Sequence, residues 1–220
     1  MRLALPSALL LPACLILFAG GCASTRPLPY AGLASSRYLQ PSDDSRGDRA
    51  PYAYQGEVDW AAYSRVILEP VTIYRGADAQ FEKVSEEQKQ QIARYMQQEF
   101  NYALSKRYYP TTRPGPGTLR VRLLLTGAEV NKKVIGTVMK FDLAGAPYNA
   151  VQAARGREGA FSGSVSYAVE IYDTQRDALL AAYVEKQYPS AMNPKASLGT
   201  LDASKAGIRK GAEALIARLQ

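Results

Sequence analysis

The stretch "LRVRLLLT", residues 119–126, alternates apolar side chains with two arginines. Successive side chains of a β-strand point to opposite faces of the sheet, so Arg120 and Arg122 share one face. The apolar residues of the other face are Leu119, Val121, Leu123 and Leu125. This pattern predicts a strand that turns one face to a hydrophobic core and holds both arginines outward.

Two other runs favour strands in the same sheet. The run "SRVILEPVTIY" (64–74) is apolar on both alternating faces, which fits a strand covered on both sides, with Pro70 at an edge or a bulge. A second alternation begins at Val165 and leads through "DTQRD" (173–177) into "ALLAAYVEKQ" (178–187). Two such runs around a short polar turn predict a hairpin.

Two amphipathic helices are expected. Ser85 opens the first with a capping box, because Gln88 follows three residues later. Its apolar face comprises Ile92, Tyr95, Met96, Phe100, Ala103 and Leu104. The face of the last helix comprises Ile208, Ala212, Leu215, Ile216 and Leu219. The order β-α-β-loop-β-β-α predicts an α+β or α/β domain over residues 57–220, a single mixed sheet with two main helices packed on it.

These segments resemble a family of bacterial lipoproteins known as domain of unknown function 3313 (DUF3313). The resemblance covers roughly residues 57–219. It rests on "PGPGTLRV" (114–121) and on "GSVSYAVEIYDTQRDALLAA" (163–182). It implies a lipoprotein with an α/β domain, and it implies no activity and no site residues.

The stretch "LFAGGCAS" (17–24) ends an apolar opening that follows Arg2. A positive start, an apolar run and small residues at its end predict an export signal over residues 1–21, too short to span a membrane. The small-small-Cys ending resembles the lipobox of bacterial lipoproteins, although Ala19 stands where that motif usually has Leu. The resemblance implies cleavage before Cys22 and acylation of that cysteine.

Two other roles of Cys22 are disfavoured. The chain's one other cysteine, Cys14, lies in the segment that would be removed, so a disulfide has no partner. A metal site needs several ligands, and the chain has no His. We therefore expect lipidation, which with more than one acyl chain gives stable anchoring. Ala23 and Ser24 follow in place of an inner-membrane retention Asp, which favours the outer membrane, on the side that faces the periplasm.

Residues 22–56 are predicted to be the lipidated N-terminus and a flexible tether. The segment is rich in Pro, Gly, Ser, Asp and Arg and lacks periodicity, so we expect it to be dispensable for folding. A tether of this length has a root-mean-square reach of about 30–35 Å. The alternative is that its tyrosines, at positions 30, 38, 52 and 54, pack part of it onto the domain.

Catalysis is not expected. A chain without His lacks the usual general base near neutral pH, and the processed chain would have no free thiol. The remaining candidates are Glu57 with Asp59, Glu86 with Glu87, Asp173 with Asp177, and Ser204 with Lys205. All stand where such residues are ordinary in helices and turns. We expect no cofactor and no metal site.

Basic residues are concentrated in the middle of the chain. The candidates for binding an anionic surface are Lys106, Arg107, Arg113, Lys132 and Lys133. They suit lipid headgroups, lipopolysaccharide or the carboxylates of peptidoglycan, whereas nucleic acid does not fit the compartment that Cys22 implies. The alternative is a solvated strand face plus a helix end whose dipole Lys106 and Arg107 complement.

The apolar stretch 134–161 is interrupted by Lys140, Asp142 and Pro147, which exclude a membrane span. It either closes the core or forms an exposed surface that meets a partner. Together these features favour a non-catalytic binding or scaffold lipoprotein of the cell envelope. A regulator that contacts an envelope-assembly enzyme is the alternative, and an enzyme with a carboxylate or Ser-Lys pair is the third class.

Overall fold

Strand β7 (Thr118–Glu129) lies inside the sheet and pairs along its length on both sides. The structure, a computed structural model, describes residues 26–42, 49–130, 150–151, 163–189 and 199–220. Leu119, Val121, Leu123 and Leu125 are all at most 1% exposed, as their alternation predicts. The strand therefore supplies one continuous apolar row to the core.

The sheet contains nine strands in the described part of the chain and is mixed. Its order is β1-β2-β9-β8-β7-β3-β6, and β4 and β5 also pair with β7. The strands are β1 (Gln40–Pro41), β2 (Tyr52–Gln55), β3 (Arg65–Leu68), β4 (Thr72–Ile73), β5 (Gln80–Glu82), β6 (Tyr109–Pro110), β8 (Ser164–Asp173) and β9 (Ala178–Gln187). Pairs from β1 to β7 are antiparallel, and β3, β4 and β5 run parallel to β7. The predicted mixed sheet and the β8–β9 hairpin are confirmed.

The predicted strand 64–74 is divided at Pro70 into β3 and β4. Between the pairs Leu68–Val121 and Thr72–Leu124, this edge has three residues (69–71) where β7 has two (122–123). The extra residue is a bulge, which suits a proline because Pro has no amide proton to donate to the ladder.

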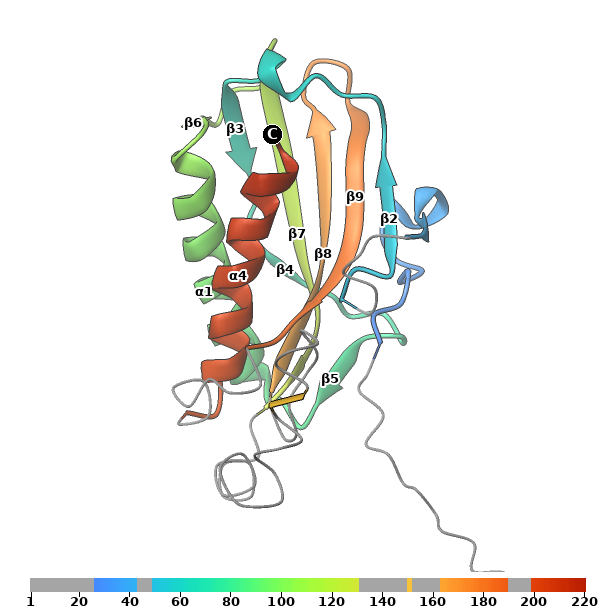
Figure 1. Cartoon of the computed structure of the whole chain (residues 1–220), viewed down its shortest axis with the longest axis vertical. Helices are drawn as coiled ribbons and strands as arrows, with labels where there is room; N and C mark the ends of the chain where they lie inside the picture. The colour runs from blue at the N-terminus through green and yellow to red at the C-terminus, as the bar shows by residue number, and fades with distance from the viewer. Residues whose placement is uncertain (1–25, 43–48, 131–149, 152–162, 190–198) are drawn as a thin grey trace, which may run out of the picture.

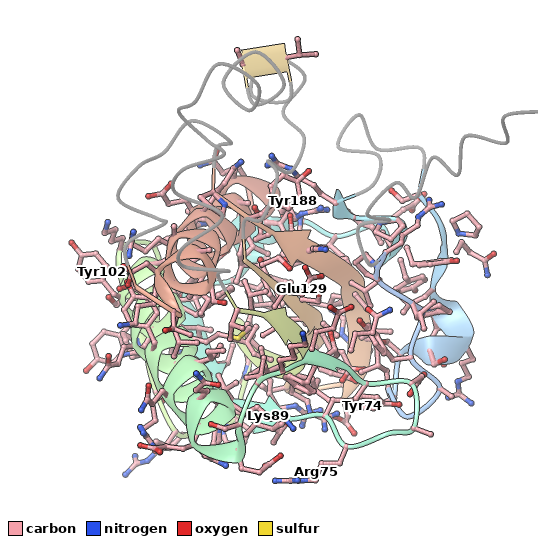
Figure 2. All side chains as sticks on the ribbon, turned by 90° about the horizontal axis from the view of Figure 1, so that it is seen from below. Tyr74, Arg75, Lys89, Tyr102, Glu129 and Tyr188 are labelled. Atoms are coloured by element: carbon pink, nitrogen blue, oxygen red, sulfur yellow. The ribbon has the colours of Figure 1, made fainter. Side chains whose placement is uncertain are left out.

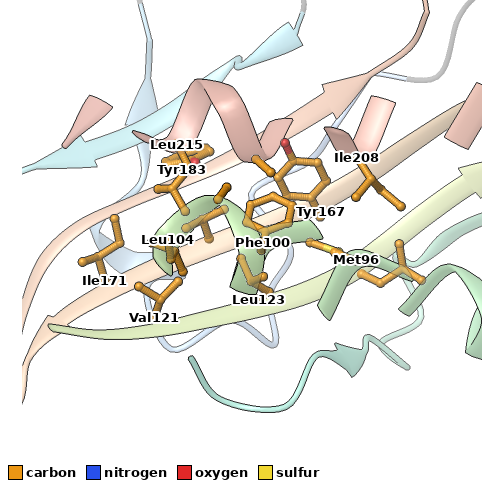
Figure 3. Packing of buried hydrophobic residues seen from close by; sticks show 14 of the residues in the cluster. Met96, Phe100, Leu104, Val121, Leu123, Tyr167, Ile171, Tyr183, Ile208 and Leu215 are labelled. Carbon is orange, nitrogen blue, oxygen red and sulfur yellow. The ribbon is translucent and has the colours of Figure 1, made fainter. Parts of the chain in front are cut away.

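Helices α1 (Glu86–Ser105) and α4 (Asp202–Arg218) lie side by side on one face of the sheet (Figure 1). Ser85 and Gln88 form the predicted capping box, in which each side chain bonds the other's backbone amide. The buried face of α1 packs on the apolar rows of β7 and β8, where the rings of Phe100 and Tyr167 meet edge to face at 5.6 Å (Figure 3).

Glycines bring α4 into direct contact with the sheet. A Cβ on Gly211 would lie 1.9 Å from the Tyr167 hydroxyl, and one on Gly207 would lie 2.9 Å from the Gln187 carbonyl oxygen. The hydroxyl of Ser204 donates to the Ser164 carbonyl oxygen at 3.0 Å. This row of small residues therefore sets how closely the helix approaches the strands.

The opposite face of the sheet is covered by the described residues of the N-terminal segment, 26–42 and 49–55, which pack on the domain as the alternative for the tyrosines expected. Tyr30, Leu33 and Leu39 are 1%, 5% and 7% exposed and form a second core. Their partners in that core are Tyr74, Ala168, Ala182 and Val184, with Tyr52 and Tyr54 packed at its border. Strands β1 and β2 extend the sheet beyond β9 (Figure 1). Composition and periodicity did not predict this layer, because its apolar surface comes from a few large side chains that follow no regular spacing.

Removing the N-terminal layer should destabilise the domain. Exposing three side chains of this kind costs about 4–9 kcal/mol, so a chain that starts at Glu57 should melt more than about 8 °C below the full-length chain. Thermal unfolding followed by circular dichroism measures this difference. A chain that starts at Arg26 is the control and should keep the melting temperature; equal melting of both shortened chains would contradict the three-layer fold.

Candidate functional site

The second face of the sheet holds a buried charge centred on Glu170, which is 1% exposed. Its Oε2 atom lies 3.0 Å from Arg122 Nη1 and accepts from the Tyr172 hydroxyl at 3.1 Å. Its Oε1 atom accepts from the Ser35 backbone amide at 2.7 Å. Glu170 therefore ties β8 both to β7 and to the N-terminal layer.

Arg120 and Arg122, predicted to point outward, are held in ion pairs on this face. Arg122 Nε lies 3.1 Å from Glu69 Oε2, and Arg120 pairs with Glu69 and with Asp177. Burial alone would lower the pKa of Arg122, but the charges of Glu170 and Glu69 outweigh it and raise that pKa. These arginines are thus neutralised within the fold.

Most of the acids, and the serine, that the sequence offered for catalysis make structural contacts. Asp59 caps the 3-10 helix η3 (Trp60–Ala62), and Glu86 pairs with Lys89 and Arg75. Asp173 accepts from two backbone amides of the hairpin turn and from the Tyr63 hydroxyl, which lies 2.8 Å away. Desolvation and this bond to Asp173 raise the pKa of Tyr63 to about 12. Ser204 is buried against β8.

Four cations lie at the end of the sheet where α1 ends and β7 begins: Arg65, Lys106, Arg107 and Arg113, here called the basic surface. Arg65 alternates with the buried Val66 and so projects from the face opposite to the helices. All four are exposed, and none forms an ion pair with an acid of the described residues. In the parallel register Arg65 lies beside Tyr109 of β6 and Thr118 of β7, and its guanidinium donates to the Pro116 carbonyl oxygen. The sequence analysis did not place Arg65 among the candidates for anion binding. Its position near them follows from the pairing of β3 with β6, which local sequence does not reveal.

Two exposed tyrosines accompany the basic surface. Tyr102 and Tyr109 are 62% and 73% exposed, and the Lys106 Nζ atom lies 4.2 Å from the centre of the Tyr102 ring. Tyr102 points outward from α1 at the rim of the molecule (Figure 2). Aromatic rings beside unpaired cations are typical of binding surfaces, where they add apolar contact area to a charged site.

Some predicted residues lie outside the described part of the chain. These are Cys22, Lys132, Lys133 and most of the stretch 134–161. Lys132 and Lys133 follow Val130, at the end of β7 opposite to Arg113, so their membership of one surface with Lys106 stays a prediction. Within the described ranges, no three His, Cys, Asp or Glu side chains gather as metal ligands. No helix there combines the length and hydropathy needed to cross a membrane.

The family model "Protein of unknown function (DUF3313)" matches residues 29–215. No curated protein matches the chain. Among solved structures, a PelC dodecamer from Paraburkholderia phytofirmans is 8% identical with a TM-score of 0.39, covering 73% of this chain and 94% of its own. A DUF330-family protein from Xanthomonas campestris is 9% identical with a TM-score of 0.33, covering 74% and 87%.

Glu170→Ala should loosen the N-terminal layer. Breaking a buried ion pair costs about 3–5 kcal/mol, and the low end applies because Arg122 is partly exposed, so the melting temperature should fall by about 6–12 °C. Trypsin should also cut faster at the exposed Arg37. Glu57→Ala, on an exposed side chain, is the matched control. Unchanged melting and unchanged cleavage of the Glu170 variant would contradict the anchoring role.

Proposed function

The chain belongs to the DUF3313 family of proteins of unknown function, and we propose that it is a non-catalytic binding protein anchored by a lipid on Cys22. In this proposal the anchor lies in the outer membrane, and the domain faces the periplasm. The lipobox-like sequence around Cys22 supports the anchor, and the contacts of the candidate catalytic groups with the fold support a binding role.

The basic surface is the observation that carries the binding role. Arg120 and Arg122 have carboxylate partners, whereas the four exposed cations of the basic surface have none among the described residues. A cluster of unpaired cations raises the local concentration of anions and speeds their association. We therefore assign to this surface an anionic partner of the envelope, and no nucleic acid.

The helix ends do not account for the whole cluster. Both α1 and α4 end near this surface, where the Tyr108 hydroxyl lies 3.5 Å from the Leu219 carbonyl oxygen. Each helix end carries about half a negative charge, so the two together offset roughly one cation. Lys106, the C-cap of α1, supplies that one cation. Arg65, Arg107 and Arg113 are positive charges in addition to it.

A regulatory contact with an envelope protein is the second candidate. Tyrosines are enriched at protein interfaces. Tyr102 and Tyr109 are the two most exposed large hydrophobic side chains in the described part of the chain. Crosslinking from the exposed position 105 in intact cells, followed by identification of the captured protein, tests this candidate. Capture of one partner that is lost when Tyr102→Ala is added would favour it.

Cys22→Ala should abolish anchoring. The substitution removes the acyl acceptor and the cleavage signal together, so the variant should incorporate no fatty-acid probe and should retain its export signal. Metabolic labelling and the mass of the mature chain measure both effects. Cys14→Ala is the control and should be labelled normally. Equal incorporation into the Cys22 variant would contradict the anchor.

Reversing the basic surface should weaken binding to anions. A soluble chain that starts at Arg26 should bind anionic vesicles or isolated peptidoglycan at low salt and release them as salt rises, because the Debye length shortens. Each cation near such a surface contributes about 1 kcal/mol, so Lys106→Glu with Arg113→Glu should weaken binding by roughly 30-fold.

Lys83→Glu with Arg94→Glu is the matched control, since both residues are exposed and the net charge changes equally. Lys106 lies twelve residues beyond Arg94 on α1, about 18 Å along the helix. The control should bind nearly as well as the unaltered chain at physiological salt. If both double variants lose binding equally, net charge and not the basic surface attracts the anion.

A further inference from the structure

The described chain begins beside the C-terminal end of β7. The Gln80 side chain donates from Nε2 to the Arg26 carbonyl oxygen at 2.9 Å, and Gln80 pairs with Gly127 in the sheet. A few residues later, Tyr30 enters the second core and donates to Gln80 Oε1 at 2.8 Å. Arg26 is therefore fixed at this end of the sheet, on the face opposite to the helices.

The basic surface lies at the other end of the same strand. Arg65 is level with Thr118, the first residue of β7, and Gly127 is nine residues further on. At about 3.3 Å per residue, these two levels are about 30 Å apart. Helix α1, which Lys106 and Arg107 follow, lies on one face of the sheet (Figure 1), and Arg26 lies on the other. Arg26 is thus separated from the basic surface along the strands, and from Lys106 and Arg107 across the sheet as well.

Four residue steps connect Cys22 to Arg26. In any conformation, four steps of chain span at most about 14 Å. This connecting segment, here called the leash, is shorter than the separation along β7. The sheet and helix α1 also lie between Arg26 and the outer side of α1. A bilayer that lies across the Arg26 end of the sheet, with the lipid on Cys22 inserted in it, therefore stays about 30 Å from the level of Arg65 while the N-terminal layer stays packed.

We infer that the basic surface faces away from the anchoring bilayer and binds a carboxylate-bearing polymer in trans, of the chemistry that peptidoglycan offers. This inference rests on the proposed lipid anchor and deepens the proposed binding role. Headgroups of the anchoring membrane match the charge equally well, but in this orientation they lie at the opposite end of β7. The protein then bridges its own membrane and an anionic polymer about 30 Å or more away from it.

The orientation is testable with single thiols, since the processed chain has no free cysteine. Lipidated Leu28→Cys and Ser105→Cys proteins, each bearing a donor dye, are reconstituted into vesicles that carry an acceptor lipid. Both side chains are exposed, one near Arg26 and one beside Lys106. Transfer should be clearly stronger from position 28, also on anionic vesicles. Equal or stronger transfer from position 105 would overturn the inference.

A lengthened leash supplies the matched control. Thirty Gly-Ser residues inserted after Ser24 add a reach of about 30 Å, which should let the basic surface meet an anionic bilayer. Transfer from position 105 should then rise on anionic vesicles and not on neutral ones. An unchanged signal on anionic vesicles would show that the leash does not set the orientation, which contradicts the inference.

Cosedimentation with isolated peptidoglycan tests the partner. Vesicles that bear the lipidated protein should be captured, and capture should be lost with Lys106→Glu and Arg113→Glu but not with Lys83→Glu and Arg94→Glu.

If the soluble chain binds peptidoglycan and the anchored protein does not, the inference alone fails. If neither binds peptidoglycan although the soluble chain binds anionic vesicles, the polymer is wrong and the anionic partner stands. If the soluble chain binds no anion, the proposed function fails as well.

Discussion

Strand β8 is buried at every one of its ten residues, on both faces. A strand that is buried on both faces needs a covering layer on each side: one for the apolar row of the first core, and one for Ala168 and the hydrogen-bonded Glu170 on the other face. The helices cover the face that carries Tyr167 and Val169. The face that carries Ala168 and Glu170 requires a further layer, and the N-terminal segment provides it. The N-terminal segment is ordered because it covers this face, and its packing also fixes the position of Arg26.

Periodic segments were predictable from the sequence, and the N-terminal layer was not. Strands β7, β8 and β9 and both helices repeat their apolar residues at the period of the element, so pattern alone identifies them. The N-terminal layer is held by single anchors, the Tyr30 ring, Leu33 and the Ser35 amide on Glu170, which no period reveals. Its tyrosines were a signal, but turn-forming residues around them have the composition of a linker.

The same difference separates the paired from the unpaired cations. Arg122 looks solvent-facing in the sequence, yet the antiparallel register places Glu170 directly opposite it, so strand pairing identifies this ion pair. The parallel pairing of β3 with β6 places Arg65 beside Tyr109, two residues after Arg107, over a sequence distance that a count of local charges does not cover. Tertiary pairing therefore decides which charges are structural and which remain for a partner.

The ordered N-terminal layer is the central claim, since it fixes the position of Arg26 and thereby the length of chain that would connect the domain to the proposed lipid on Cys22. Native-state hydrogen exchange on the mature protein tests it most directly at the Ser35 amide, which donates to Glu170. We expect this amide to exchange with an opening free energy comparable to that of amides in β8, because both belong to one packed unit. Exchange of the Ser35 amide at the rate of an unfolded peptide, with β8 fully protected, would contradict the account.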